Sequence, residues 1–216
     1  MSSSEPRYIV VEGVIGAGKT SLARRLAQSF GSELLLEEPE ENPFLERFYR
    51  NPRQAALPTQ LYFLFQRARQ LQALRQGDMF CTVRVADFLM EKDRLFAQLN
   101  LDDDEMWLYE QVYSRLALDA PAPDLVIYLQ APVEVLLKRI VKRGIPYEQL
   151  IESAYLQRLV DAYTRFFYHY DAAPLLIVNA SEIDPVNNEQ DYNLLLEQVR
   201  TIRSGRHFFN PAPVAP

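Results

Sequence analysis

Cysteine is almost absent from this sequence of 216 residues, in which Cys81 stands alone, so no disulfide bond can form within the chain. This composition fits a reducing compartment. Long apolar runs are missing as well, because no stretch approaches the roughly 20 residues that a membrane-spanning helix needs. The first residues lack the basic and apolar regions of a signal peptide. We therefore expect a cytoplasmic protein.

Positive charge is also in short supply. The 23 lysines and arginines are outnumbered by 29 aspartates and glutamates, which leaves a net charge of -6. Such a balance argues against sequence-independent binding to nucleic acid or to an anionic membrane. It does not exclude a small local basic site for a phosphate group. The remaining composition, 48% hydrophobic and 24% charged, is typical of a globular protein with one domain.

Short apolar runs alternate with longer helical patterns along the chain, and this predicts an α/β fold. Near-continuous apolar strands between helices are typical of a parallel sheet that helices cover on both faces. We expect five strands, at residues 8–12, 33–37, 79–85, 125–129 and 175–178. We expect helices at residues 20–30, 54–76, 104–118, 132–144, 147–170 and 189–204. These elements predict one domain over residues 8–204, between a flexible tail at 1–7 and an extended tail at 205–216.

A phosphate-binding loop is the strongest motif in the chain. The pattern G-x-x-x-x-G-K-[ST] is matched in full by Gly13, Gly18, Lys19 and Thr20, between a predicted strand and a predicted helix. The glycines let backbone N–H groups point at phosphate oxygens, Lys19 is expected to reach the β and γ phosphates of ATP, and Thr20 to offer a hydroxyl ligand to Mg²⁺. A glycine-rich turn with a chance lysine is the weaker interpretation, because the strand and the helix are both in place. The predicted phosphate-binding residues are Gly13, Val14, Ile15, Gly16, Ala17, Gly18, Lys19, Thr20 and Ser21.

A phosphate-binding loop alone does not identify the acceptor, but a series of further motifs follows it in order. They are Glu37-Glu38-Pro39, the run from Phe48 to Pro52, Gln60 with Arg67 and Arg69, Asp87, the run from Asp93 to Ala97, the run from Tyr128 to Gln130, Arg139 to Arg143, and Tyr155-Leu156. In order and spacing, these motifs resemble the deoxyribonucleoside kinase family over residues 8–184. The resemblance implies a P-loop nucleoside-kinase fold and transfer of the γ-phosphoryl group of ATP to the 5′-hydroxyl of a deoxyribonucleoside with Mg²⁺. It also implies a homodimer.

The resemblance assigns the catalytic carboxylate to Asp87, at the end of the third predicted strand. An alcohol is a weak nucleophile, and a carboxylate within hydrogen-bonding reach can accept its proton. Asp87 could equally hold a water molecule bound to Mg²⁺. From the residues alone, a helix N-cap is as good an interpretation of this aspartate.

The nucleoside site implied by the family falls on scattered positions. Glu38 resembles the acid at the 5′ end of the sugar, Tyr49 and Glu148 the pair that binds the 3′-hydroxyl, Gln60 the amide that contacts the base, and Arg67 and Asp93 the pair that sets base preference. Gln60 and Arg67 are seven residues apart on one predicted helix and so share a face. Taken singly, each could be a solvated surface residue, and Tyr49 could be a core residue.

A cluster of cations follows at Lys138, Arg139, Lys142 and Arg143. Cations are also favoured at the C-terminus of a helix, which is the simpler interpretation. In the family, arginines here belong to a lid, predicted at residues 139–149, that closes over the transferring phosphate, so Arg139 and Arg143 are candidate catalytic residues. Residues 182–184 are expected to form a turn near the adenine of ATP.

The sequence departs from the family pattern at four positions, where Phe88 replaces an arginine, Leu89 a serine, Ile145 a lid arginine and Val14 an asparagine. Arg84 is a candidate replacement for the first arginine. Two alternatives therefore stay open. One is a nucleoside monophosphate kinase of the thymidylate type, which needs extra cations for the acceptor phosphate, and the other is a non-catalytic nucleotide-binding regulator. The sequence does not specify the nucleobase.

Overall fold

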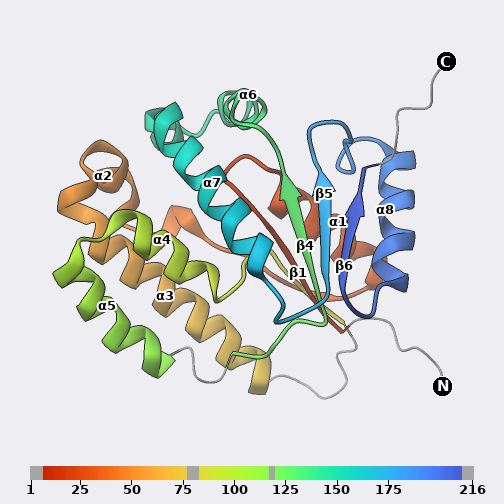
Figure 1. Cartoon of the computed structure of the whole chain (residues 1–216), viewed down its shortest axis with the longest axis horizontal. Coiled ribbons are helices and arrows are strands. Elements are labelled where there is room, and N and C mark those ends of the chain that lie inside the picture. The colour runs from red at the N-terminus through yellow and green to blue at the C-terminus, as the bar shows by residue number, and fades with distance from the viewer. Residues whose placement is uncertain (1–6, 77–82, 117–119, 211–216) are drawn as a thin grey trace.

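The computed structural model describes residues 7–76, 83–116 and 120–210. The fold is a parallel sheet of six strands in the order β2-β3-β1-β4-β5-β6, with helices on both sides (Figure 1). The strands are β1 (Tyr8–Gly13), β2 (Glu33–Leu35), β3 (Arg84–Ala86), β4 (Leu125–Gln130), β5 (Leu175–Asn179) and β6 (Arg206–Phe209). The predicted α/β fold with a parallel sheet is confirmed.

The predicted number of five strands was wrong, because β6 lies in the segment expected to be an extended tail. Arg206, His207 and Phe208 are exposed, so this strand has no apolar pattern that would reveal it. Its backbone pairs with β5 at the edge of the sheet, from Leu175 opposite Arg206 to Val178 opposite Phe209. Residues 79–82 of the predicted third strand, including Cys81, lie outside the described residues.

Helices lie on both faces of the sheet and at its two sides. Figure 1 shows α7 in front of the sheet and α1 behind it, with α2, α3, α4 and α5 grouped together on the left and α8 at the right. The helices are α1 (Lys19–Phe30), α2 (Leu45–Arg50), α3 (Pro52–Gln76), α4 (Lys92–Asn100), α5 (Asp103–Leu116), α6 (Val133–Arg143), α7 (Ser153–His169) and α8 (Glu189–Thr201). Short 3₁₀ turns lie at η1 (Pro39–Glu41) and η3 (Pro146–Leu150). Among the described residues, no helix is both long enough and apolar enough to cross a bilayer.

The long helix expected at residues 147–170 is in fact two elements. Ile151 and Glu152 have extended backbone dihedrals, so the 3₁₀ turn η3 ends before α7 begins. Glu148 in η3 is buried as a result, instead of lying on the solvated face of a long helix. On α7, Phe167 packs on Tyr128 of β4 with ring centroids 4.2 Å apart, and this fixes the helix over the sheet.

The central strand β1 pairs with β3 on one side and with β4 on the other. The chain therefore leaves β1 toward one half of the sheet and later returns to fill the other half. In open parallel sheets, ligands bind at such a switch point, outside the carboxyl ends of the strands. The loops that follow β1, β2 and β3 meet at this edge.

Candidate active site

The phosphate-binding loop joins β1 to α1 and lies against β4 and α6. Gly13 and Gly16 must be glycines here, since a Cβ at Gly13 would come within 2.7 Å of the Leu129 carbonyl oxygen and one at Gly16 within 2.9 Å of the Leu136 carbonyl oxygen. Gly18 has φ +101° and caps the N-terminus of α1. The partial positive charge of that helix end favours a phosphate at the loop.

Lys19 crosses the mouth of this loop, where its Nζ donates a hydrogen bond to the carbonyl oxygen of Gly13 over 2.9 Å. Burial, followed by the nearby ammonium of Lys92, lowers the pKa of Lys19, and the carboxylates around it oppose this shift. Among the other residues of the loop, Val14 and Ala17 are buried in the protein, whereas Ser21 is exposed and lines a second cavity.

Thr20 and Asp87 are in direct contact. The Thr20 hydroxyl donates to Asp87 Oδ2 over 2.5 Å, and the backbone N–H of Glu37 donates to Asp87 Oδ1 over 2.8 Å. Burial and the Glu37 carboxylate raise the pKa of Asp87, while these hydrogen bonds and Lys19 lower it. The N-cap interpretation of Asp87 was wrong, because α4 begins only at Lys92.

The pair also fits a magnesium site. Mg²⁺ is usually held by one or two protein oxygens together with substrate phosphates and water. The hydroxyl of Thr20 and the carboxylate of Asp87 supply such oxygens next to the phosphate-binding loop. In the described part of the chain, no group of three or more metal-ligating side chains forms a closed cage.

A cavity opens beside the loop and holds about 850 Å³ of empty space, counting its part open to solvent. Ten of the residues predicted from the sequence line this cavity: Ile15, Gly16, Lys19, Thr20, Tyr49, Gln60, Arg67, Asp87, Arg143 and Glu148. Segments far apart in the chain therefore meet around one space.

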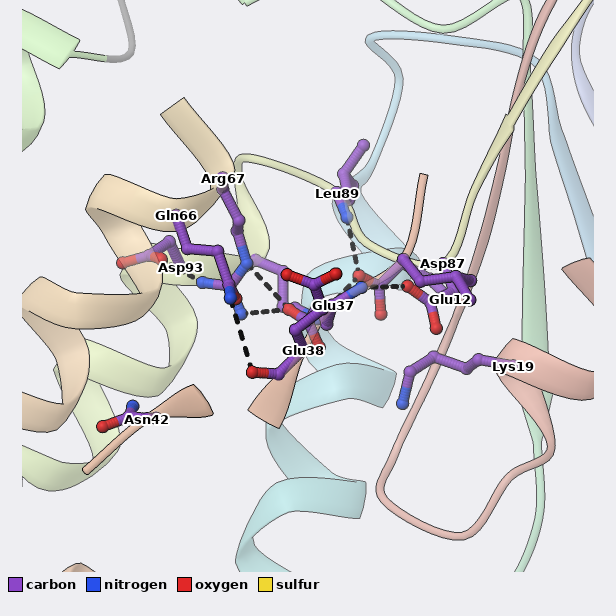
Figure 2. A network of polar contacts seen from close by, with 12 residues as sticks. Glu12, Lys19, Glu37, Glu38, Asn42, Gln66, Arg67, Asp87, Leu89 and Asp93 are labelled. Carbon is purple, nitrogen blue, oxygen red and sulfur yellow. Dashed lines mark hydrogen bonds and ion pairs between the residues drawn. The ribbon is translucent and has the colours of Figure 1, made fainter. Parts of the chain in front are cut away.

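The acid that faces this cavity from the segment after β2 is Glu37, and the placement expected for Glu38 was wrong. The Glu37 carboxylate accepts a hydrogen bond at Oε1 from Arg67 Nε over 2.8 Å (Figure 2). The same oxygen accepts a hydrogen bond from Lys92 Nζ over 3.0 Å. Glu38 is exposed and does not line the cavity, and its backbone carbonyl accepts a bond from Gln66. Adjacent acids point to different sides of an extended chain, and nothing in the sequence tells which of the two points inward.

The charge of Glu37 is set by its cationic neighbours. Burial alone raises the pKa of this carboxyl group, but Arg67, Lys92 and Lys19 together hold the pKa well below its ordinary value. Glu37 is therefore ionised at neutral pH, at the wall of the cavity and beside the phosphate-binding loop.

Of the residues expected to recognise the base, Gln60 and Arg67 are buried on α3 and Asp93 is buried on α4. Gln60 is buried and its Oε1 has no hydrogen-bond partner among the described residues. Arg67 lines the cavity and pairs with Asp93, which is fully buried and accepts a further hydrogen bond from the Tyr109 hydroxyl. Asp93 itself does not reach the cavity, so it can act on a ligand only through Arg67.

Tyr49 and Glu148, the pair expected to bind the 3′-hydroxyl, both line the cavity. Glu148 is 6% exposed, and both of its carboxylate oxygens accept hydrogen bonds from Arg143. Burial raises the pKa of Glu148, and Arg143 opposes that shift. The ring of Tyr49 stacks on Tyr147 with centroids 6.2 Å apart. Tyr49 is half-buried, and it both lines the cavity and packs against the core.

A second cavity lies on the other side of the phosphate-binding loop. It is lined by Gly18, Ser21, Arg139 and residues 183–187, which include part of the predicted adenine turn. Arg139 donates to the carbonyl oxygens of Ala17 (3.2 Å) and Ala180 (2.7 Å) and so ties the loop to the end of β5. Two cavities thus flank one phosphate-binding loop, an arrangement that suits a donor and an acceptor.

Two of the residues that depart from the family pattern, Phe88 and Leu89, are buried in the core. Arg84 pairs with Glu33 over 3.2 Å and does not line the cavity, so it does not replace the missing arginine. Lys92 lies in the cavity wall instead, which the sequence reasoning missed.

The fold and the two cavities define a P-loop phosphotransferase that acts on a small molecule. The chain belongs to the deoxynucleoside kinase family, whose family model matches residues 9–204. It is 33% identical over 204 residues to the deoxyguanosine kinase of Bacillus subtilis (strain 168), with 90% of this chain and 97% of that one covered. It is 27% identical over 202 residues to the deoxyadenosine/deoxycytidine kinase of the same organism, with 90% of this chain and 92% of that one covered.

Solved structures agree with this assignment. The structure of deoxyadenosine kinase from M. mycoides with bound dATP superposes with a TM-score of 0.78 at 26% identity and covers 90% of this chain and 100% of that one. The protein is therefore a deoxynucleoside kinase, a phosphotransferase that uses a nucleotide phosphoryl donor and a deoxynucleoside acceptor.

Proposed function

We propose that this kinase transfers the γ-phosphoryl group of ATP to the 5′-hydroxyl of a purine deoxyribonucleoside, with Mg²⁺, and that Glu37 accepts the proton of that hydroxyl. The observation that carries the proposal is the ionised Glu37 carboxylate in the wall of the cavity, beside Lys19 and the phosphate-binding loop. The donor occupies the cavity beyond the loop and the nucleoside the cavity beside Glu37.

In the proposed step, the 5′-oxygen attacks the γ-phosphorus as its proton passes to Glu37. A bond forms between the 5′-oxygen and phosphorus, the bond from phosphorus to the bridging oxygen breaks, and that oxygen keeps the electron pair as ADP leaves. Glu37 later releases the proton to water. Lys19 and Arg143 stabilise charge on the phosphates, an effect that is commonly the largest part of catalysis in phosphoryl transfer.

Asp87 takes a different role in this proposal from the general base expected from the family. Both of its carboxylate oxygens already accept hydrogen bonds, from Thr20 and from the backbone of Glu37. Thr20 and Asp87 together would hold Mg²⁺, directly or through water, and Mg²⁺ supplies charge neutralisation at the phosphates. Asp87 also orients Glu37 through the backbone N–H.

The choice of a purine rests on the two polar side chains at the base end. A carboxamide such as that of Gln60 matches the donor and acceptor of adenine, and a guanidinium such as that of Arg67 matches the two acceptors of guanine. The relatives named for deoxyguanosine and deoxyadenosine support this choice.

The alternative of a thymidylate-type kinase finds less support in the acceptor cavity. Among the described residues, the cations that line it are engaged: Arg67 and Lys92 contact Glu37, Arg143 contacts Glu148, and Lys19 contacts Gly13. An acceptor that already carries a phosphate would have to displace one of these pairs.

The proposal includes a homodimer, built on the side of the molecule that α3 and α5 form together. Trp107 and Leu108 on α5 are 67% and 44% exposed, and Phe65 on the adjacent α3 is 46% exposed. Large exposed apolar groups on neighbouring helices are typical of an interface. A second copy of the chain related by a two-fold axis would cover the same residues on both subunits.

A panel of nucleosides tests the function. The purified chain with ATP and Mg²⁺ is assayed against the four deoxynucleosides and against the matching monophosphates, and ADP release is measured. We expect turnover with deoxyguanosine or deoxyadenosine that exceeds turnover with thymidine at least tenfold. Turnover with monophosphates alone would favour the thymidylate-type reading, and turnover with pyrimidines alone would refute the purine assignment.

A further inference from the structure

Lys92 is a buried ammonium group that the sequence did not single out. It lies at the start of α4, is 3% exposed and reaches the wall of the acceptor cavity. Burying a charge is costly unless it is paired and hydrogen-bonded. Lys92 meets this condition twice, because its Nζ lies 3.0 Å from Glu37 Oε1 and 3.2 Å from Glu12 Oε1.

Glu12 is a rigid anchor for this ammonium. It is completely buried at the end of β1, one residue before the phosphate-binding loop. Its Oε1 accepts from the backbone N–H of Leu89 over 2.8 Å, and its Oε2 accepts from the backbone N–H of Gly13 over 3.0 Å and from the Tyr163 hydroxyl over 3.3 Å. Lys92 therefore connects the strand that carries the loop to the acid in the cavity wall.

The contacts at Glu37 are unequal between its two oxygens. Arg67 and Lys92 both donate to Oε1, and in the described part of the chain no hydrogen bond engages Oε2. Two cations on one oxygen fix the orientation of the carboxylate and leave the other oxygen as an acceptor. Arg67 also pairs with Asp93, whereas Lys92 also pairs with Glu12, which lies next to the phosphate-binding loop.

We propose that Lys92 is a positioning residue for phosphoryl transfer, which holds the Glu37 carboxylate turned so that Oε2 faces the nucleoside hydroxyl. This inference rests on the proposed role of Glu37 as proton acceptor. It also accounts for the departure at Phe88, because the cation beside the acid comes from α4 and not from the position after Asp87. The neighbouring Leu89 contributes only its backbone N–H, to Glu12.

The effect of removing Lys92 has a definite direction. The charged groups around Glu37 come from five elements or loops: Arg67 on α3, Lys92 on α4, Lys19 on α1, Glu12 on β1 and Asp87 after β3. Without Lys92, Arg67 alone would hold Oε1 of Glu37, and the carboxylate could turn away from the nucleoside hydroxyl. The loss should therefore appear in kcat, with the KM for the nucleoside changed far less.

The test is the split between kcat and the nucleoside KM for Lys92→Met and Lys92→Arg, with Arg84→Met as the matched control. Arg84 is a partly buried cation whose partner, Glu33, lies outside the cavity. We expect the KM of Lys92→Met for the nucleoside to change far less than its kcat, because the positioned carboxylate acts in the transition state. Its kcat should fall about ten- to a hundredfold, the scale of a small misplacement of a reacting group. Lys92→Arg should recover most of the lost kcat, and Arg84→Met should change neither kcat nor KM.

Folding is controlled with a second variant. Lys92→Met leaves Glu12 buried without its ion pair, so the double variant Glu12→Gln/Lys92→Met, which removes both charges together, is measured beside it. A wild-type kcat in either folded variant would overturn the proposal and leave Lys92 a purely structural residue. If Glu37→Gln instead retains wild-type kcat, the proposed role of Glu37 fails, and this outcome is separate from the behaviour of Lys92.

Discussion

The sharpest prediction concerns Glu37→Gln. The substitution keeps the size of the side chain and removes the charge that would accept the proton. The remaining buried cations keep partners, because Arg67 still pairs with Asp93 and Lys92 with Glu12, so the fold should be retained. General-base help typically contributes about 10²–10⁴ in rate, and we expect kcat to fall by that factor with the KM for the nucleoside changed far less.

The matched control is Glu38→Gln, which makes the same chemical change one residue along the chain. Glu38 is exposed and outside the cavity, so kcat should stay within about twofold of wild type, as expected for a surface change. The assay is ADP release at saturating ATP, Mg²⁺ and deoxynucleoside, with a thermal melt of each variant to verify folding. A loss of activity in Glu38→Gln with full activity in Glu37→Gln would refute the assignment of the inward-facing acid.

Glu37→Gln also tests how much the charge of Glu37 contributes to the stability of the fold. The pKa of Glu37 is lower in the folded protein than in the unfolded chain, so its charge stabilises the fold above the ordinary carboxylate pKa. That contribution is lost as the pH falls through the lowered pKa of the folded state. The difference in melting temperature between wild type and Glu37→Gln should therefore be largest near neutral pH and shrink in acid. A difference that grows in acid would contradict the cation cluster described around this residue.

Three further predictions follow from other parts of the site. Glu148→Gln should raise the KM for a deoxynucleoside by about tenfold, which is the scale of a hydrogen bond to a charged group. The KM for a 2′,3′-dideoxynucleoside should change little, and equal effects on both KM values would exclude contact with the 3′-hydroxyl. Thr20→Val should raise the Mg²⁺ concentration needed for half-maximal activity, whereas Thr20→Ser, which keeps the hydroxyl, should not; identical Mg²⁺ curves would remove Thr20 from the metal site. Trp107→Glu should convert a dimer to a monomer in sedimentation or size-exclusion measurements. Phe208 is a similarly exposed aromatic residue on the edge strand β6, and Phe208→Glu should leave the dimer unchanged. A monomeric wild type would end the dimer proposal.

Local patterns in the sequence determined the scaffold of this protein. The glycines, Lys19 and Thr20 need only the turn between one strand and one helix, so their spacing alone predicted the loop and its chemistry. The apolar strands predicted a parallel sheet for the same reason, because burial on both faces leaves a direct mark on composition. β6 left no such mark, since backbone pairing at an edge places few demands on side chains.

Tertiary structure alone decided which side chains share the site. Glu37 and Glu38 are equivalent in the sequence, and only the path of the chain after β2 turns Glu37 inward, where charges from α1, α3 and α4 surround it. Lys92 gave no signal, because its partners Glu12 and Glu37 are 80 and 55 positions away and a charge on a short helix usually lies in water. A sequence records the preferences of neighbouring residues, whereas the electrostatics of a buried site depend on distances that exist only once the sheet has brought its strand ends together.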